Sequence, residues 1–402
     1  MRKRLITFLK AHPTILSVFW SFLGVILKIL SPFFPIRKRI LFASFGGRRF
    51  DDSPRALYEA ICNDSFFDDW ELIWCFVNPN DFTLKRGRKV KIDSFLFFVS
   101  LLTSNIWISN SGMARGISFH RKRIIEVETW HGTPIKRIGG EEKQNSMISN
   151  LEKSKIDKRK IDNRTIRCAQ SEFDRGVFQR IFHAAKDSIL LCDLPRNDEL
   201  LHYSNERIKH IKENLHIPSG KRVLLYTPTY REYLIDKSNS TYLAPPITLE
   251  KWERMLSDDY VLLIRAHYAI TKALNLSESD FFINVSNYPS INDLYSISDV
   301  MISDYSSTFI DFSIQNKPML CFAYDLDEYE QKRGLYFDLE EILPCRIDRT
   351  EDELIQDIMN LDFKEASYRT SIFHQSFAPY AGCACDTVLL TIKKRLEKRI
   401  HR

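Results

Sequence analysis

The sequence predicts an α/β protein built from two halves. Short apolar or β-branched runs alternate with helix-length segments along the 402 residues, a pattern typical of parallel βαβ units. A polar and basic segment at 201–220 separates two groups of such runs, and about 200 residues on each side are enough for a domain with its own core. A hydrophobic content of 44% with 27% charged residues excludes wholesale disorder.

The expected strands divide between the two halves. In the first half they occupy 39–44, 71–77, 106–109, 124–129, 166–169 and 188–192, with a buried helix near 94–103. In the second half they occupy 222–227, 260–265, 281–284, 299–303 and 318–323. The carboxyl ends of parallel strands meet at one edge of a sheet, where α/β proteins bind ligands. We therefore expect the functional side chains in the turns that follow these strands.

The N-terminal region differs in charge from the rest of the chain, whose formal net charge is +6. Residues 1–50 contain ten Lys and Arg and no Asp or Glu, whereas the other 352 residues carry 48 basic and 52 acidic side chains. A nucleic-acid binder needs basic charge over its folded body, so we expect no nucleic-acid partner. The stretch 11–27 is uncharged and mostly apolar, slightly short of the ~20 residues of a spanning helix.

We expect residues 1–36 to lie on, or insert shallowly into, the cytoplasmic face of the cell membrane, so that the protein is peripheral there. A signal peptide and a buried N-terminal helix are the alternatives. The basic tail at 393–402 is a second candidate for membrane contact. The charged stretch 137–165 is expected to form an exposed helix or a mobile loop.

The sequence lacks the motifs of several enzyme classes. It has no G-x-x-x-x-G-K-[ST], G-x-S-x-G, H-E-x-x-H or G-x-G-x-x-G. The sequence therefore lacks the residues that define P-loop ATPases, α/β-hydrolases, zinc proteases and dinucleotide oxidoreductases. The eight cysteines contain no C-x-x-C pair, which favours buried free thiols in a reducing compartment. We expect neither a metal ion nor a cofactor.

One turn combines a histidine with conformationally restricted neighbours. Trp130-His131-Gly132-Thr133-Pro134 directly follows the expected strand 124–129. Gly132 and Pro134 fix a tight turn, and an imidazole titrates near neutrality, which suits a general base acting on an alcohol. The alternative is a histidine that is hydrogen-bonded within the turn.

Two turns of the second half suit phosphate. Arg265 and His267 alternate at a strand end, so they share one side of the extended chain and together suit a diphosphate. Ser306-Ser307-Thr308 begins a helix after the strand 299–303, where hydroxyls and free N–H groups bind anions. The respective alternatives are an exposed strand end and plain N-capping.

Two further turns carry arginines. They are Pro195-Arg196-Asn197-Asp198 and Thr227-Pro228-Thr229-Tyr230-Arg231, and each follows an expected strand. Arginine- and histidine-bearing turns on both sides of the expected crevice indicate a site for a strongly anionic ligand.

In their order, these segments resemble the CDP-glycerol glycerophosphotransferases, which are the teichoic-acid primases and polymerases. The resemblance covers roughly residues 40–385. The matching segments are Trp130 to Pro134, Pro195 to Asp198, Pro228 to Arg231, Arg265-Ala266-His267, Ser303-Asp304-Tyr305-Ser306-Ser307 and Arg333-Gly334-Leu335-Tyr336-Phe337-Asp338.

The resemblance implies a GT-B fold with two Rossmann-like domains, an acceptor domain at 37–205 and a CDP-polyol-binding domain at 206–402, with the active site in the cleft between them. It also implies transfer of glycerol phosphate, or a related polyol phosphate, from a CDP-polyol to a hydroxyl of a lipid-linked glycan, with release of CMP. The product would be teichoic acid or a capsular polymer of the cell envelope.

The resemblance implies a part for each motif residue. His131 would be the general base on the acceptor hydroxyl, and His267 with Arg265 would serve the donor diphosphate and the leaving group. Ser306, Ser307 and Thr308 would hold phosphate. The remaining expected substrate contacts are Trp130, Gly132, Thr133, Pro134, Arg196, Asn197, Thr229, Arg231, Ser303 and Asp304.

Some residues depart from the family pattern and leave alternatives open. Tyr268 stands where the family usually has proline, and Ser53-Pro54 replaces the usual Asn-Pro. The donor polyol therefore stays open between glycerol, ribitol and another polyol. A GT-B glycosyltransferase that uses a nucleotide sugar is the alternative enzyme, and a membrane-bound scaffold with an inactive site is the alternative outside enzymes.

Overall fold

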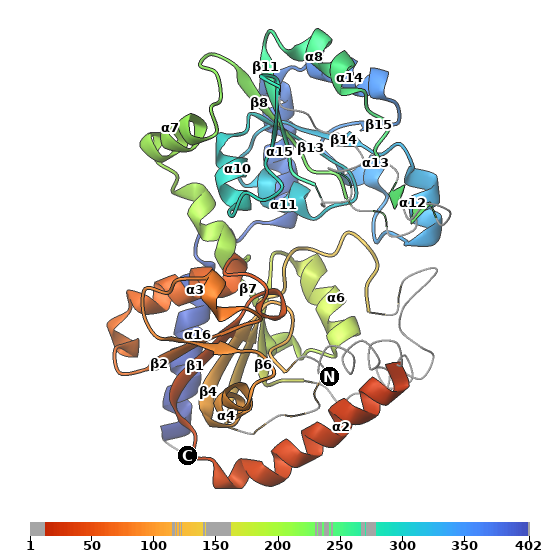
Figure 1. Ribbon diagram of the computed structural model, residues 1–402. Helices are drawn as coiled ribbons and strands as arrows, with labels where there is room; N and C mark the ends of the chain where they lie inside the picture. Colours follow the sequence, from red (N-terminus) through yellow and green to blue (C-terminus); the bar gives the residue numbers. More distant parts are fainter. Residues whose placement is uncertain are drawn as a thin grey trace.

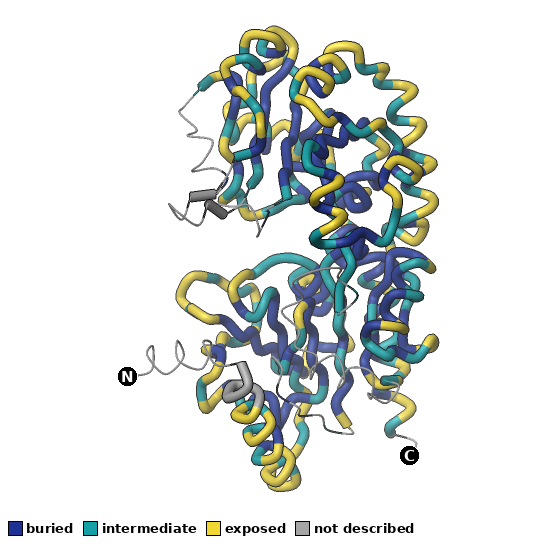
Figure 2. The backbone as a smooth tube through the Cα atoms, turned by 90° about the vertical axis from the view of Figure 1, so that its right-hand side faces the viewer, coloured by how far each residue is buried: buried dark blue, intermediate teal, exposed yellow. Residues whose placement is uncertain are grey.

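The computed structural model describes residues 13–114, 117, 119, 121, 123–139, 141, 162–229, 231, 235–236, 241–242, 244–266, 270 and 279–400. They form two α/β halves, one above the other in Figure 1, each with a parallel sheet at its centre. Buried residues concentrate in the strands of both halves (Figure 2). The expected α/β class with parallel sheets is confirmed.

The first sheet has the strand order β3-β2-β1-β4-β5-β6-β7, and its neighbouring strands pair in parallel. The strands are β1 (Arg37–Ala43), β2 (Glu71–Phe76), β3 (Arg88–Lys91), β4 (Ser104–Ser109), β5 (Ile125–Glu128), β6 (Thr165–Ala169) and β7 (Ile189–Leu191). Because the order reverses at β1, a topological switch point lies between β1 and β4. The register there places Leu41 beside Trp107.

Helices cover both faces of the first sheet because its strands are apolar on both sides. They are α2 (Pro13–Leu30), α3 (Asp52–Cys62), α4 (Phe95–Thr103), α6 (Glu172–Phe182) and α16 (Ala384–Ile400). Phe42 and Trp74 share a core with α3 and α16. Leu41 and Trp107 share a second core with α4 and the buried Leu27 of α2. The last helix of the chain thus packs on the first sheet, as Figure 1 shows.

The second sheet has the order β12-β11-β8-β13-β14-β15 and is also parallel. Its strands are β8 (Arg222–Tyr226), β11 (Tyr260–Ile264), β12 (Phe282–Asn284), β13 (Val300–Ser303), β14 (Met319–Phe322) and β15 (Ile347–Asp348). A separate antiparallel pair joins β9 (Ile235–Asp236) to β10 (Thr241–Tyr242). The switch point of this sheet lies between β8 and β13.

Helices cover the second sheet as well. They are α7 (Asn205–Asn214), α8 (Leu249–Leu256), α10 (Ile291–Ile297), α11 (Thr308–Ser313), α12 (Leu326–Lys332), α13 (Leu339–Ile342), α14 (Glu351–Met359) and α15 (Phe363–Phe377). Phe309 of α11 and Phe373 of α15 share one core with Val223, while Trp252 of α8 and Leu354 of α14 share the other.

The strands predicted from the sequence are present. The sequence missed the two-residue strands β9 and β10 of the antiparallel pair, and it missed one short strand in each parallel sheet. β3 reads Arg-Lys-Val-Lys and β15 has two residues, so neither forms an apolar run. Both lie at sheet edges. The first sheet draws on residues before 192 and the second on residues from 222 to 348. The division at 205/206 stays a prediction, and α16 crosses it to reach the first sheet.

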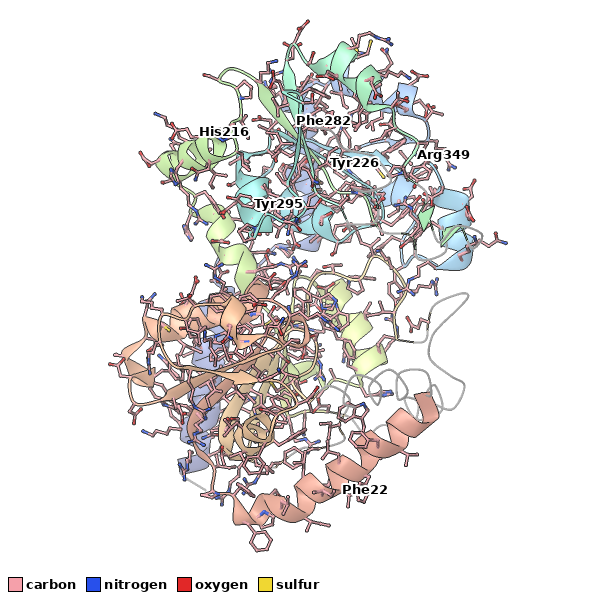
Figure 3. The ribbon with its side chains drawn as sticks, viewed as in Figure 1. Phe22, His216, Tyr226, Phe282, Tyr295 and Arg349 are labelled. Atoms are coloured by element: carbon pink, nitrogen blue, oxygen red, sulfur yellow. The ribbon has the colours of Figure 1, made fainter. Side chains whose placement is uncertain are left out.

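The helix α2 exposes one apolar face. Leu27 is buried and Trp20 and Leu23 pack beside it, whereas Phe22 is 63% exposed and points away from the body of the molecule (Figure 3). In the described part of the chain, no helix combines the length and apolarity needed to cross a bilayer. The expected stretch 137–165 falls mostly outside the described residues.

The basic tail is engaged by the first half. Lys393 forms an ion pair with Asp64 at 2.6 Å. Arg395 and Arg399 donate to the backbone carbonyls of Arg164 and Arg123. All eight cysteines are free; Cys383 is exposed, and the others are buried or half-buried.

Candidate active site

The turns singled out by sequence meet at the boundary between the two halves. The loop after β5 carries His131 and then runs to the second half, where Lys136 pairs with Leu335 in a β-bridge. Opposite it lie the carboxyl ends of β8 and β13 and the start of α11. Tyr295 of α10 lies at the edge of the second half that faces the first (Figure 3).

The backbone of the His131 loop has no room for a side chain at Gly132. Its φ of +140° is strained for an L residue, and an added Cβ would lie 2.4 Å from Ser307 Oγ. Trp130 also has a positive φ of 59°. Its ring stacks on the His131 imidazole with centroids 4.3 Å apart and meets Phe182 of α6 edge-on. The loop is therefore held between its own half and the start of α11.

A hydrogen bond fixes the tautomer of His131. Its Nδ1 lies 2.9 Å from the carbonyl oxygen of Asn110. A carbonyl only accepts, so Nδ1 carries the proton and Nε2 keeps its lone pair. Burial lowers the pKa of His131, the bond to Asn110 opposes this, and the Arg196 charge lowers it further. The imidazole is thus neutral near pH 7 and suits proton abstraction.

A buried carboxyl group that carried no role in the sequence analysis supports this arrangement. Oε2 of Glu128 accepts from Ser109 Oγ and from the Gly112 N–H, both at 2.8 Å. These bonds hold the loop that presents the Asn110 carbonyl to His131. Burial raises the pKa of Glu128 to about 8, so this group is largely protonated at neutral pH. The only sequence signal was a glutamate at the end of an apolar strand.

Arg196 lies within hydrogen-bond distance of His131, but carboxylates occupy its guanidinium. Nη1 is 2.5 Å from Asp52, and Nη2 is 2.5 Å from Asp311 and 3.2 Å from the His131 carbonyl. Asn197 donates to Asp311 at 2.9 Å. The two residues expected to contact the donor are therefore bonded to acids of the protein, and Asp311 comes from the second half.

Arg231 is similarly enclosed. Its guanidinium lies 2.6 Å from Asp304 and 2.8 Å from Asp325, and its side chain is 3% exposed. Asp304 also accepts from the Thr229 N–H at 2.9 Å. Ser303 Oγ donates to the Thr227 carbonyl at 2.9 Å. Arg231, Ser303 and Asp304 are buried, and together with the half-buried Thr229 they form a cluster at the strand ends.

Arg265 differs from the other two arginines. It is half-buried and donates to the Tyr288 carbonyl at 2.7 Å, and it forms no ion pair with any carboxylate in the described ranges. Burial lowers its pKa. Of the three arginines, it alone lacks a carboxylate partner in this part of the chain, so its positive charge remains available to an anionic ligand. His267 and its neighbour Tyr268 lie outside the described residues.

The hydroxyl-rich segment lies at the start of α11, as its sequence predicts. Ser306 Oγ accepts from the Thr308 N–H at 3.3 Å, and Thr308 Oγ1 lies 3.2 Å from Ser303 Oγ. Ser307 faces Gly132. Thr133 and Pro134 are buried behind this contact, and Thr133 Oγ1 lies 3.0 Å from Asp174.

Several known proteins are similar to this chain in sequence and in architecture. Residues 28–392 match the family model of CDP-glycerol:poly(glycerophosphate) glycerophosphotransferase. A teichoic acid glycerol-phosphate transferase of Staphylococcus aureus is 32% identical over 91% of this chain and 95% of its own length. A teichoic acid poly(glycerol phosphate) polymerase of Staphylococcus epidermidis is also 32% identical over 83% of this chain, which spans 47% of that polymerase.

Solved structures agree with the sequence comparison. The wall teichoic acid polymerase TagF superposes with a TM-score of 0.83 and 30% identity, over 91% of each chain. A TagF variant soaked with CDPG gives a TM-score of 0.82 at 29% identity, again over 91% of each chain. A MnaA–UDP structure of S. aureus shares the fold at 13% identity and a TM-score of 0.55. The chain therefore belongs to the CDP-glycerol:poly(glycerophosphate) glycerophosphotransferase family.

Proposed function

We propose that this glycerophosphotransferase moves glycerol phosphate from CDP-glycerol to a hydroxyl of a lipid-linked acceptor and releases CMP, in the synthesis of teichoic acid or a related cell-envelope polymer. The observation that carries the proposal is the state of His131. It is a neutral imidazole whose Nε2 forms no hydrogen bond with the described residues, and its loop contacts both halves of the chain. The GT-B arrangement, with the reaction between the two halves, belongs to this proposal.

The reaction is a substitution at phosphorus. His131 Nε2 takes the proton of the acceptor hydroxyl, whose oxygen bonds to the β-phosphorus of CDP-glycerol. The bond between that phosphorus and the bridging oxygen breaks, and the oxygen leaves on CMP. Charge spreads over the phosphoryl oxygens in the transition state, so fixed cations and N–H donors stabilise it.

The proposed donor contacts differ in kind. Arg265 binds the diphosphate directly, because its charge is not balanced by an ion pair within the described chain. Ser306, Ser307 and Thr308 offer hydroxyls and N–H groups to the transferred phosphate, and His267 is proposed to assist the leaving group. Arg196, Asn197, Thr229, Arg231, Ser303 and Asp304 position these groups through the contacts described above.

We also propose that α2 attaches the protein peripherally to a membrane. Phe22 and Phe33 are 63% and 78% exposed, and Val18, Val25 and Ile29 are exposed beside them. Exposed apolar patches of this kind mark interaction surfaces. The basic residues that flank this region in the sequence favour anionic headgroups. Such attachment would bring the enzyme to a lipid-linked acceptor.

Donor turnover tests the proposal. The full chain is incubated with CDP-glycerol or CDP-ribitol and a lipid-linked glycan, and CMP release is measured. UDP- and GDP-sugars serve as matched alternatives, since a glycosyltransferase would use one of them. CMP release with a CDP-polyol supports the proposal. Turnover of a nucleotide sugar alone, or of no donor with any acceptor, overturns it.

A further inference from the structure

His131, the proposed base, and the two residues that follow it are each held by contacts that lead to one short helix of the other half. His131 accepts, through its carbonyl, from Arg196, whose guanidinium also donates to Asp311 of α11. Gly132 packs on Ser307, at the start of the same helix. Thr133 donates its N–H to Gln170 Oε1 at 3.0 Å, and its Oγ1 lies 3.1 Å from the same oxygen and 3.0 Å from Asp174 Oδ2.

Gln170 links Thr133 to the same helix. Its Nε2 lies 3.3 Å from Oδ1 of Asp311, which also accepts from Asn197. One carboxylate thus uses Oδ2 for Arg196 and Oδ1 for Gln170 and Asn197. Asp311 is linked to His131 through Arg196 and to Thr133 through Gln170. Both oxygens of Asp311 are occupied by groups of the first half.

The connection is buried and charged. Asp311 is 2% exposed, and Gln170, Asn197 and Thr133 are buried as well. In such surroundings, removing one partner of a charge pair is far more costly than at a surface. Water does not replace a lost bond there at low cost. The position of the loop therefore depends on the charge of Asp311, not only on packing.

We propose that Asp311 is a positioning residue for the transfer reaction, which sets the His131 loop from the opposite half through Arg196 and Gln170. This inference rests on the proposed function, in which Ser306 to Thr308 contact the transferred phosphate. Asp311 follows that segment by three residues on α11. One helix would then fix both the phosphate and the base, so that the two are correctly spaced only when the halves are in contact.

The test compares Asp311→Asn with wild type in the full chain. We expect CDP-glycerol affinity to change by less than about threefold and kcat for CMP release to fall between about tenfold and a hundredfold, as expected for a misplaced catalytic group. Amide hydrogen exchange should accelerate at residues 131–133. Asp311→Glu, which keeps the charge, should recover part of kcat. Gln315→Ala is the control, since Gln315 donates from the same half to the Leu200 carbonyl but forms no hydrogen bond with residues 131–133 in the described structure.

Each other outcome is decisive. Unchanged kcat and unchanged exchange at residues 131–133 in Asp311→Asn would overturn the inference, and so would an equal loss of donor affinity and kcat. If Asp311→Asn does not fold, Gln170→Met breaks the Thr133 connection alone and should accelerate exchange at the same residues; slow exchange there would refute the inference. Absence of CMP release by wild type with any CDP-polyol refutes the proposed function instead, while the exchange comparison still decides the structural connection.

Discussion

Gly132 and Ser307 lie in direct contact across the boundary between the two halves, so close that a Cβ on Gly132 would be 2.4 Å from Ser307 Oγ and 2.9 Å from its Cβ. The contact joins the loop of the proposed base to the segment of the proposed phosphate contacts. A methyl group added at this point must push the two apart.

We therefore expect Gly132→Ala to abolish most CMP release, because the loop, with its φ of +140°, can neither accept the strain nor stay in contact with Ser307. The matched control is Gly220→Ala. Gly220 also has a positive φ, +86°, but no atom lies within 4 Å of its added Cβ, so it tests strain alone, at about 1 kcal/mol. Melting temperature and turnover are measured for both. Equal activity in the two variants would contradict the expectation.

A second prediction concerns the protonation of His131. The neutral imidazole is the active form, and burial lowers its pKa from the ordinary 6.5. The rate should accordingly rise with pH through a midpoint below 6.5 and level off near neutrality. His131→Gln should lose CMP release and this acid limb together while keeping its melting temperature. If the residual activity of His131→Gln still rises with pH in this range, a group other than His131 causes the pH dependence.

The raised pKa of Glu128 predicts that the stability of the fold depends on pH. Its pKa in the folded protein is about 8, against 4.5 for the free side chain. The folded state therefore holds a proton that the unfolded state releases, and stability falls as pH rises from about 4.5 to about 8. Glu128→Gln cannot ionise and keeps an oxygen for Ser109 and Gly112. The difference in melting temperature between Glu128→Gln and wild type should therefore shift in favour of the variant as the pH rises through this range. A constant difference would show that Glu128 does not change its charge there.

The sequence predicted the strands and the turns of the site better than the contacts between those turns. The runs 222–227 and 260–265 are apolar and β-branched, so their strand character is local. One carboxylate partner of Arg196 lies 115 residues away at Asp311, and one partner of Arg231 lies 73 residues away at Asp304. An arginine in a turn is compatible with a bound anion or with a protein carboxylate, and only the packing of the two halves decides between them.

Membrane attachment gives a prediction on a separate surface. Phe22→Asp with Phe33→Asp places one charge on the exposed face of α2 and one on the turn Ser31–Phe33 that follows it. The double substitution should shift the full chain from anionic vesicles of phosphatidylglycerol to the supernatant on sedimentation. The apolar contacts of Leu27 with the first half are untouched, so the melting temperature should hold. Tyr368→Asp is the control, because Tyr368 is 62% exposed on α15 of the second half. Vesicle binding that survives the double substitution would locate the attachment elsewhere.

Three arginines that look alike in sequence should respond differently to replacement by methionine. Arg231→Met leaves Asp304 and Asp325 buried without their cation and should cost about 3–5 kcal/mol of unfolding free energy. Arg349 also bridges two acids, but its side chain is 44% exposed, so Arg349→Met should cost less than about 1 kcal/mol. Arg265→Met removes no ion pair within the described chain and should leave stability nearly unchanged while raising the KM for CDP-glycerol by roughly tenfold. Denaturant unfolding and donor titration measure both quantities. If Arg265→Met destabilised the fold as Arg231→Met does, or left the donor KM unchanged, Arg265 would be structural and the diphosphate would be bound elsewhere.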